Sequence, residues 1–84
     1  MDIETRILEI LGEALELPPQ RLVELGRDSA LLGAIPELDS MGVLAVIPLL
    51  EERFGFIIGD EEIDGTTFAT LGTLADFVAE KLGG

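Results

Sequence analysis

Hydrophobic residues recur at helical spacing in three separate stretches of the chain. In the first, from Asp2 to Leu17, apolar residues fall on one face and glutamates on the other, until Pro18 and Pro19 end the pattern. The apolar face consists of Ile3, Ile7, Leu8, Leu11, Ala14 and Leu15. Because a spacing of three or four residues brings these side chains to one side, the pattern predicts an amphipathic helix over 2–17.

The second apolar stretch runs from Ser40 to about Phe54, with Asp39 in position to cap a helix. The positions at core spacing are Leu44, Ile47, Leu50 and Phe54, flanked by Val43 and Val46. Pro48 lies inside this stretch, where a proline removes the hydrogen bond to the carbonyl of Leu44 and costs about 3 kcal/mol in an ideal helix. We therefore expect the helix either to kink at Pro48 or to be shorter than the pattern indicates.

The third stretch predicts a last helix over 71–82, capped by Thr70, and a short helix is expected over 61–64 after a cap at Asp60. Between 20 and 38 the sequence has no sustained period, which indicates a long ordered loop, with a helical turn near 29–32. Three longer helices and one short helix predict an all-α fold, a small antiparallel four-helix bundle with a long loop between its first two helices. Residues 1–84 are expected to form a single domain.

Composition narrows the classes of function. The chain has no His and no Cys, so no disulfide and no His- or Cys-based catalytic set can be built. With 17 acidic residues in 84, carboxylate pairs arise by chance, and we expect no acid/base active site and no enzyme. Asp60, Glu62 and Asp64 have the spacing that opens a calcium-binding loop, but Leu71 occupies the position that needs a bidentate Glu, so no metal site is expected.

The formal net charge of −12 should repel nucleic acid and anionic membranes and favour partners with basic surface patches. The alternative is that this charge only keeps a hydrophobic small protein in solution. The longest uncharged stretch, 40–50, is too short to span a bilayer, and the N-terminus lacks an apolar signal core. We therefore expect a cytoplasmic protein without membrane insertion.

Ser40 is the strongest candidate for a functional residue. It follows the long loop and begins the second helix, where unpaired N–H groups and the helix dipole favour a phosphate. The structural alternative is that Asp39 and Ser40 form an ordinary helix start. A second Asp-Ser pair precedes Gly33 and Pro36 too closely to open a long helix, so Ser29 is expected to have a local turn or capping role.

The residues around Ser40, 37–43, resemble the attachment site of acyl carrier proteins. Residues 51–55 (Glu-Glu-Arg-Phe-Gly) follow at the spacing where acyl carriers end their second helix. Residues 68–71 resemble the start of the last helix in that family, and 76–78 resemble a polar-aromatic-aliphatic pattern within it. The resemblance covers nearly the whole chain, is weakest in the loop before Ser40, and implies a non-catalytic carrier.

The resemblance implies a covalent 4'-phosphopantetheine arm on Ser40, whose thiol holds acyl groups as thioesters. During loading by a phosphopantetheinyl transferase, Asp39 would help to orient the serine and the magnesium ion that the transferase uses. Acyl-loading and acyl-transferring enzymes would then act on the loaded form. We expect the protein to be a monomer. The residues that could line an acyl cleft, or simply pack the core, are Leu44, Ile47, Leu50, Phe68, Leu71 and Leu74. The residues expected to face partners are Met41, Gly42, Ala45, Glu51 and Glu52.

The sequence departs from the family pattern directly after Ser40. Fatty-acid carriers usually place carboxylates on the exposed side of this helix, whereas here Gly42 and Ala45 occupy those positions and no charge occurs before Glu51. This favours a specialised carrier in a lipid-, polysaccharide- or polyketide-like pathway, similar to carriers associated with bacterial surface-polysaccharide or exosortase gene sets. The alternatives are a peptidyl, aminoacyl or D-alanyl carrier and an arm-free protein-interaction domain of the same fold.

Overall fold

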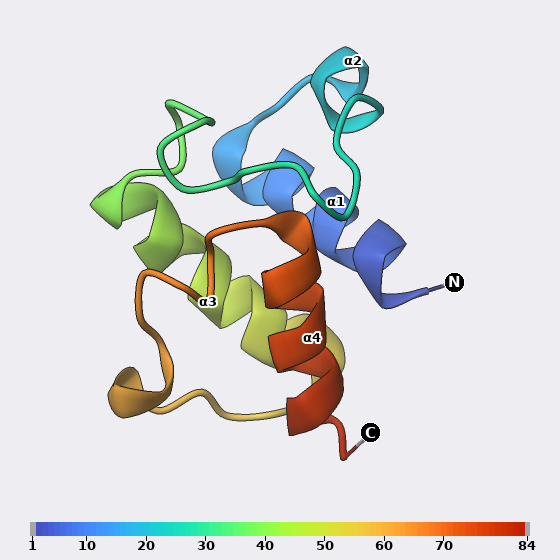
Figure 1. Cartoon of the computed structure of the whole chain (residues 1–84). Coiled ribbons are helices and arrows are strands. Elements are labelled where there is room, and N and C mark those ends of the chain that lie inside the picture. Colours follow the sequence, from blue (N-terminus) through green and yellow to red (C-terminus); the bar gives the residue numbers. More distant parts are fainter. Residues whose placement is uncertain (1, 84) are drawn as a thin grey trace.

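The computed structural model describes residues 2–83, which form helices and turns around one core. The elements in chain order are α1 (Ile3–Leu15), α2 (Pro19–Leu22), α3 (Ser40–Phe54), the 3-10 turn η1 (Asp60–Glu62) and α4 (Leu71–Lys81). No strand occurs among the described residues, and α1 packs against α2, α3 and α4. Figure 1 shows the three long helices gathered together, with long connections crossing over their ends. The predicted all-α bundle is confirmed.

No helix within residues 2–83 combines the length and the apolar character that crossing a membrane requires.

Each long helix begins with a side-chain cap. The N–H groups of Thr5, Gly42 and Thr73 donate to the side-chain oxygens of Asp2 (2.7 Å), Asp39 (2.9 Å) and Thr70 (3.1 Å). These short polar side chains satisfy N–H groups that the first turn of a helix leaves unpaired. The predicted starts at residues 40 and 71 are therefore confirmed.

The first helix is shorter than predicted, and the helical turn lies elsewhere in the loop. α1 ends at Leu15 because Glu16 adopts a left-handed conformation with φ of 55°. Pro19 then begins the short helix α2, at a helix position where the missing N–H of proline has no cost. The prediction of a helical turn near 29–32 is wrong, because this segment forms turns and an isolated bridge instead.

The long loop is joined to the start of α4 by four backbone hydrogen bonds. They run from Leu31 N to Ala69 O (3.0 Å), Leu32 N to Phe68 O (3.0 Å), Leu71 N to Ser29 O (3.0 Å) and Gly72 N to Arg27 O (2.8 Å). A Cβ at Gly72 would lie 2.9 Å from Arg27 O, so the absence of a side chain allows this approach. The Arg27 guanidinium also pairs with Asp76 (2.8 Å) and Glu4 (3.0 Å), and both carboxylates raise its pKa. The predicted ordered loop is confirmed.

The buried face of α3 differs from the predicted one. The residues of α3 that are buried are Gly42, Val46, Leu50 and Phe54, whereas the side chain of Leu44 is 64% exposed. The prediction of Leu44 as a core residue is therefore wrong. Because α3 carries apolar side chains on nearly every side, its sequence does not mark the face that packs against α1.

α3 continues as a helix through Pro48 and ends at Gly55, whose φ is 77°. Pro48 and Leu44 are both exposed, so a water molecule can donate a hydrogen bond to the Leu44 carbonyl in place of the missing N–H. The boundaries predicted at 40 and 54 are confirmed, and the expectation that the helix could be shorter is wrong.

The short helix after α3 is a single 3-10 turn, η1, which begins one residue before the predicted start at 61 and ends at Glu62. The Glu62 carboxylate accepts the N–H of Gly59 (2.7 Å) and pairs with Lys81 of α4 (2.8 Å). Both interactions lower the pKa of Glu62, and the one with Lys81 has the larger effect. They also hold η1 against the end of α4.

Candidate functional site

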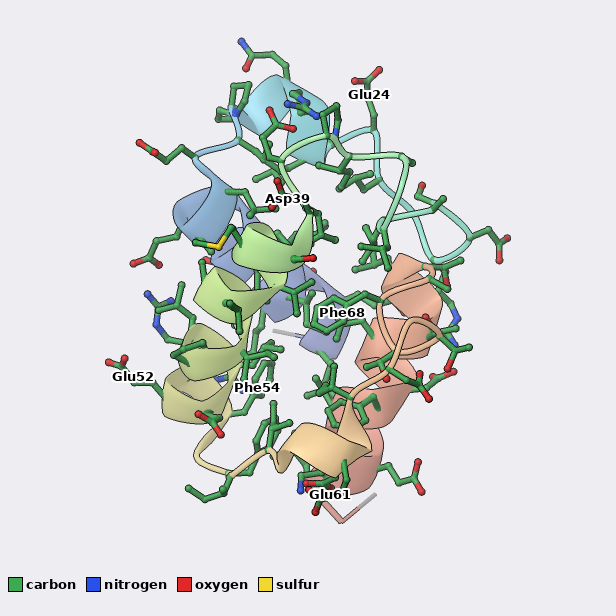
Figure 2. All side chains as sticks on the ribbon, turned by 90° about the vertical axis from the view of Figure 1, so that its left-hand side faces the viewer. Glu24, Asp39, Glu52, Phe54, Glu61 and Phe68 are labelled. Atoms are coloured by element: carbon green, nitrogen blue, oxygen red, sulfur yellow. The ribbon has the colours of Figure 1, made fainter. Side chains whose placement is uncertain are left out.

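Ser40 is exposed at the first position of α3, directly after the long loop. Asp39 precedes it in an extended conformation and accepts two N–H groups of the first turn, from Gly42 at its carboxylate and from Val43 at its carbonyl (both 2.9 Å). Figure 2 shows Asp39 where the loop enters the helix. The loop therefore delivers the Ser40 hydroxyl to the surface at the end of a helix where the dipole favours an anionic group.

Gly42 allows the loop to pass close to α3. A Cβ at this position would lie 2.4 Å from the carbonyl oxygen of Glu37 and 3.1 Å from Cδ2 of Leu15. Gly42 is buried beneath these groups, so the expectation that it belongs to a partner-facing surface is wrong. The loop is held at the same point by the ion pair of Glu37 with Arg21, which lowers the pKa of Glu37.

An apolar hollow opens beside Ser40, with a volume of about 350 Å³. Its lining residues are Leu32, Ser40, Val43, Leu44, Ile63, Asp64, Gly65 and Phe68. A second hollow of about 200 Å³ is lined by Val43, Leu44, Ile47, Ile58, Gly59 and Ile63, so the two share three residues. We call the two hollows together the trough. Figure 2 shows Phe68 between α3 and α4, and Ser40 lies at one end of the trough.

The structure separates the six predicted cleft residues into two groups. Leu44 and Phe68 line the hollow beside Ser40, and Ile47 lines the second one. The other three, Leu50, Leu71 and Leu74, are at most 1% exposed, pack in the core and line neither hollow.

Sequence reasoning missed Ile63, which lines both hollows and is half-buried. Its signal was its position as a single apolar residue within the acidic segment 60–64. It also missed Leu32, which the loop brings to the trough from a stretch without any helical period.

Apart from Gly42, four residues are expected from the sequence to face partners, and their surroundings differ. Met41 is 72% exposed, and Ala45 and Glu52 are also exposed. Glu52 points away from the body of the protein in Figure 2. Glu51 is half-buried, and its carboxylate accepts the N–H of Ile58 (2.8 Å), so it connects α3 to the following segment.

Within residues 2–83, no group of three or more His, Cys, Asp or Glu side chains is placed to hold a metal ion. Asp64 accepts hydrogen bonds from Thr66 (N–H, 2.9 Å) and Thr67 (N–H, 3.2 Å). The Thr66 hydroxyl also donates to Asp64, and this bond, followed by the two N–H bonds, lowers the pKa of Asp64. Together they close a turn before Phe68.

Comparison with known proteins agrees with this geometry. The family described as phosphopantetheine attachment site matches residues 3–78 of the chain. The chain is 49% identical in sequence to a holo acyl carrier protein from Nitrosomonas europaea. Its structure matches the solution structure of that protein with a TM-score of 0.90, over 100% of both chains. The chain therefore belongs to the phosphopantetheine-binding acyl carrier family, whose members are not enzymes and hold their cargo on a covalently attached 4'-phosphopantetheine.

Proposed function

We propose that Ser40 carries the 4'-phosphopantetheine arm and that the chain delivers acyl groups to partner enzymes. The arm supplies a thiol that holds the acyl group as a thioester. The observation that carries the proposal is the exposed Ser40 hydroxyl at the first turn of α3, at one end of an apolar trough. Ser29 lacks this setting, because its hydroxyl accepts the N–H of Gly26 (2.8 Å) within a turn.

The residues around Ser40 fit such an arm. The first turn of α3 presents its positive end to a phosphate on Ser40. The trough offers apolar walls on which Val43, Leu44 and Ile63 can keep water from an acyl chain. The exposed Asp39, which also caps α3, is placed to orient a metal ion and the Ser40 hydroxyl when a transferase loads the arm.

Phosphopantetheinyl transferases and acyl-handling enzymes are the partners of this family. For this chain we propose partners with basic surface patches, because a net charge of −12 attracts such surfaces over long distances.

We further propose a specialised pathway rather than housekeeping fatty-acid synthesis. The support is the exposed side of α3, which remains uncharged from Met41 to Pro48. The test is turnover of the loaded carrier by a housekeeping malonyl transferase and a housekeeping ketosynthase. Efficient turnover by both enzymes would contradict the specialised pathway.

The attachment site is tested by intact mass before and after incubation with coenzyme A, magnesium and a broad-specificity phosphopantetheinyl transferase. We expect the wild type and Ser29→Ala to gain one phosphopantetheine and Ser40→Ala to gain none. Ser40→Ala should remain folded because Asp39, not Ser40, caps α3. Modification of Ser40→Ala, or no modification of the wild type by several transferases, would overturn the proposal, and the latter result would favour an arm-free interaction domain.

A further inference from the structure

We propose that the ion pair between Glu62 and Lys81 limits the length of the acyl chain that the trough can shelter. The pair joins η1 to the last residue of α4 and holds one wall of the trough in place. We call this wall, residues 57–66, the outer wall. The role assigned to the pair rests on the proposed function, in which Ser40 carries an acylated arm.

The two walls of the trough are held in different ways. On one side, the N–H of Leu32 donates to the Phe68 carbonyl (3.0 Å), so the backbone itself joins the loop to the start of α4. The outer wall contributes Ile58, Gly59 and Ile63. Among the described residues, no backbone hydrogen bond leads from the outer wall to α1, α3, α4 or the long loop. Figure 1 shows this segment running outside the three long helices. The outer wall is therefore the side of the trough that can move without breaking backbone bonds to its neighbours.

Side chains hold the outer wall at two points. The Glu51 carboxylate of α3 accepts the N–H of Ile58 (2.8 Å). Further along, both carboxylate oxygens of Glu62 accept from Nζ of Lys81 (2.8 and 3.0 Å), and one of them also accepts the N–H of Gly59 (2.7 Å). A chain longer than the trough would have to push the outer wall away from α3 and α4. Because Glu62 lies within that wall, such a movement breaks the bond to Lys81.

The Glu62–Lys81 pair is the least exposed ion pair of the described residues. Its side chains are 22% exposed at Lys81 and 35% at Glu62, whereas those of Arg53 and Glu13 are 41% and 55% exposed. Charges that are shielded from water and salt attract each other more strongly than exposed charges. Lys81 also lowers the pKa of Glu62, so this carboxylate is charged at neutral pH. The pair is therefore better suited than the exposed pairs to resist an advancing acyl chain.

The length of the trough indicates the class of cargo. The lining residues follow α3 from Ser40 to Ile47, which is about 10 Å of helix. An extended octanoyl chain has about this length. Butanoyl and octanoyl groups therefore fit while the outer wall is closed, whereas a dodecanoyl group does not.

The test compares Lys81→Met and Glu62→Gln with the controls Arg53→Met and Glu13→Gln. Each control makes the same change of charge in an ion pair between α1 and α3, and neither control residue lines the trough. Glu62→Gln keeps a side-chain oxygen that can accept the N–H of Gly59, so the substitution acts on the pairing with Lys81. Lys81→Arg keeps the positive charge and serves as the conservative variant.

All proteins are loaded by a broad-specificity transferase with magnesium and butanoyl-, octanoyl- or dodecanoyl-coenzyme A. Intact mass verifies loading, and circular-dichroism melting verifies folding. The measured quantity is the rate constant for cleavage of the thioester by hydroxylamine. Its ratio to the rate constant for the same acyl group on free pantetheine gives the protection of that group, because a thioester drawn towards the trough reacts more slowly.

In the wild type we expect greater protection of the octanoyl group than of the butanoyl or dodecanoyl group. In Lys81→Met and Glu62→Gln, protection of the dodecanoyl group should rise about fivefold, the scale of burying one or two more methylene groups, with less than about a twofold change for butanoyl. The reason is that a released outer wall admits the longer chain. Lys81→Arg and both controls should match the wild type.

Unchanged protection of the dodecanoyl group in Lys81→Met and Glu62→Gln would overturn the proposal. Weaker protection of all three groups would also overturn it, since the pair would then build the trough and not limit it. Equal protection of all three groups by the wild type would have the same meaning. Each of these results leaves attachment at Ser40 intact. If the wild type is not loaded at all, the proposed function fails and the role of the ion pair fails with it.

Discussion

At the scale of single residues, the site depends on positions without a side chain as much as on Ser40 itself. Gly42 lets the Glu37 carbonyl approach α3, and Gly72 lets the Arg27 carbonyl approach α4. Both contacts hold parts of the loop that leads to Ser40. The orientation of that hydroxyl is therefore determined in part by residues that carry no chemistry.

We predict that Gly42→Ala lowers the free energy of unfolding by about 1–3 kcal/mol, the usual effect of forcing a methyl group into a packed site. The reason is that the new Cβ would lie 2.4 Å from the Glu37 carbonyl oxygen, which belongs to the backbone and cannot rotate away. Urea unfolding measures the change. Gly26→Ala is the control, since a Cβ there meets nothing within 4 Å. Equal stability of the two variants would contradict the prediction.

At the scale of elements, α3 combines two roles that its sequence does not separate. One side packs against α1, and the opposite side exposes Met41, Leu44, Ala45 and Pro48 next to Ser40. Pro48 lies on the exposed side, where its missing N–H leaves the Leu44 carbonyl to solvent. The helix therefore tolerates a proline that would break it more severely if it were on the buried side.

We predict that Pro48→Ala raises the free energy of unfolding by about 2 kcal/mol. Removing the proline restores a hydrogen bond in the helix interior and stabilises the fold by about 3 kcal/mol. It also gives the unfolded chain more freedom, which destabilises the fold by about 0.4–1 kcal/mol. Urea unfolding gives the size of the effect, and hydrogen exchange of the new amide at position 48 tests its bond to Leu44. Pro36→Ala is the control, because Pro36 lies in the loop and should only lose the second contribution. A variant no more stable than wild type would show that α3 has adapted to the proline.

At the scale of the whole molecule, charge is distributed very unevenly. Four of the five cationic side chains, Arg21, Arg27, Arg53 and Lys81, pair with one or two carboxylates each. The pKa values of Glu37 and Glu62 are lowered below the ordinary 4.5, so the stabilisation from these two pairs is complete above about pH 4.5 and is lost as pH falls through the lowered values. At pH 7 the remaining excess of negative charge favours expansion of the fold.

We predict that raising sodium chloride from about 0.05 to 0.5 M at pH 7 increases Tm, because screening weakens repulsion more than it weakens exposed ion pairs of small energy. If screening recovers about 1 kcal/mol, the expected rise is about 4–8 °C for a domain of this size. Thermal melting by circular dichroism measures it, with magnesium chloride at equal ionic strength as the comparison. A Tm that stays constant with salt would show that charge crowding does not limit stability.

The sequence by itself determined where the long helices start and that Ser40 begins one of them. These features depend on local signals, namely caps such as Asp39 and Thr70 and the glycine after Phe54, which act on adjacent residues. The order of the three long helices and the all-α fold follow from the same signals together with apolar spacing.

Only the tertiary structure decided which side of α3 is buried, because a helix that is apolar nearly all round can pack on several faces. It also moved Leu44 from the expected core to the trough, brought Ile63 beside it from a distant acidic segment, and buried Gly42 under the loop. Each of these outcomes depends on contacts between residues far apart in the chain, and no local spacing encodes such contacts.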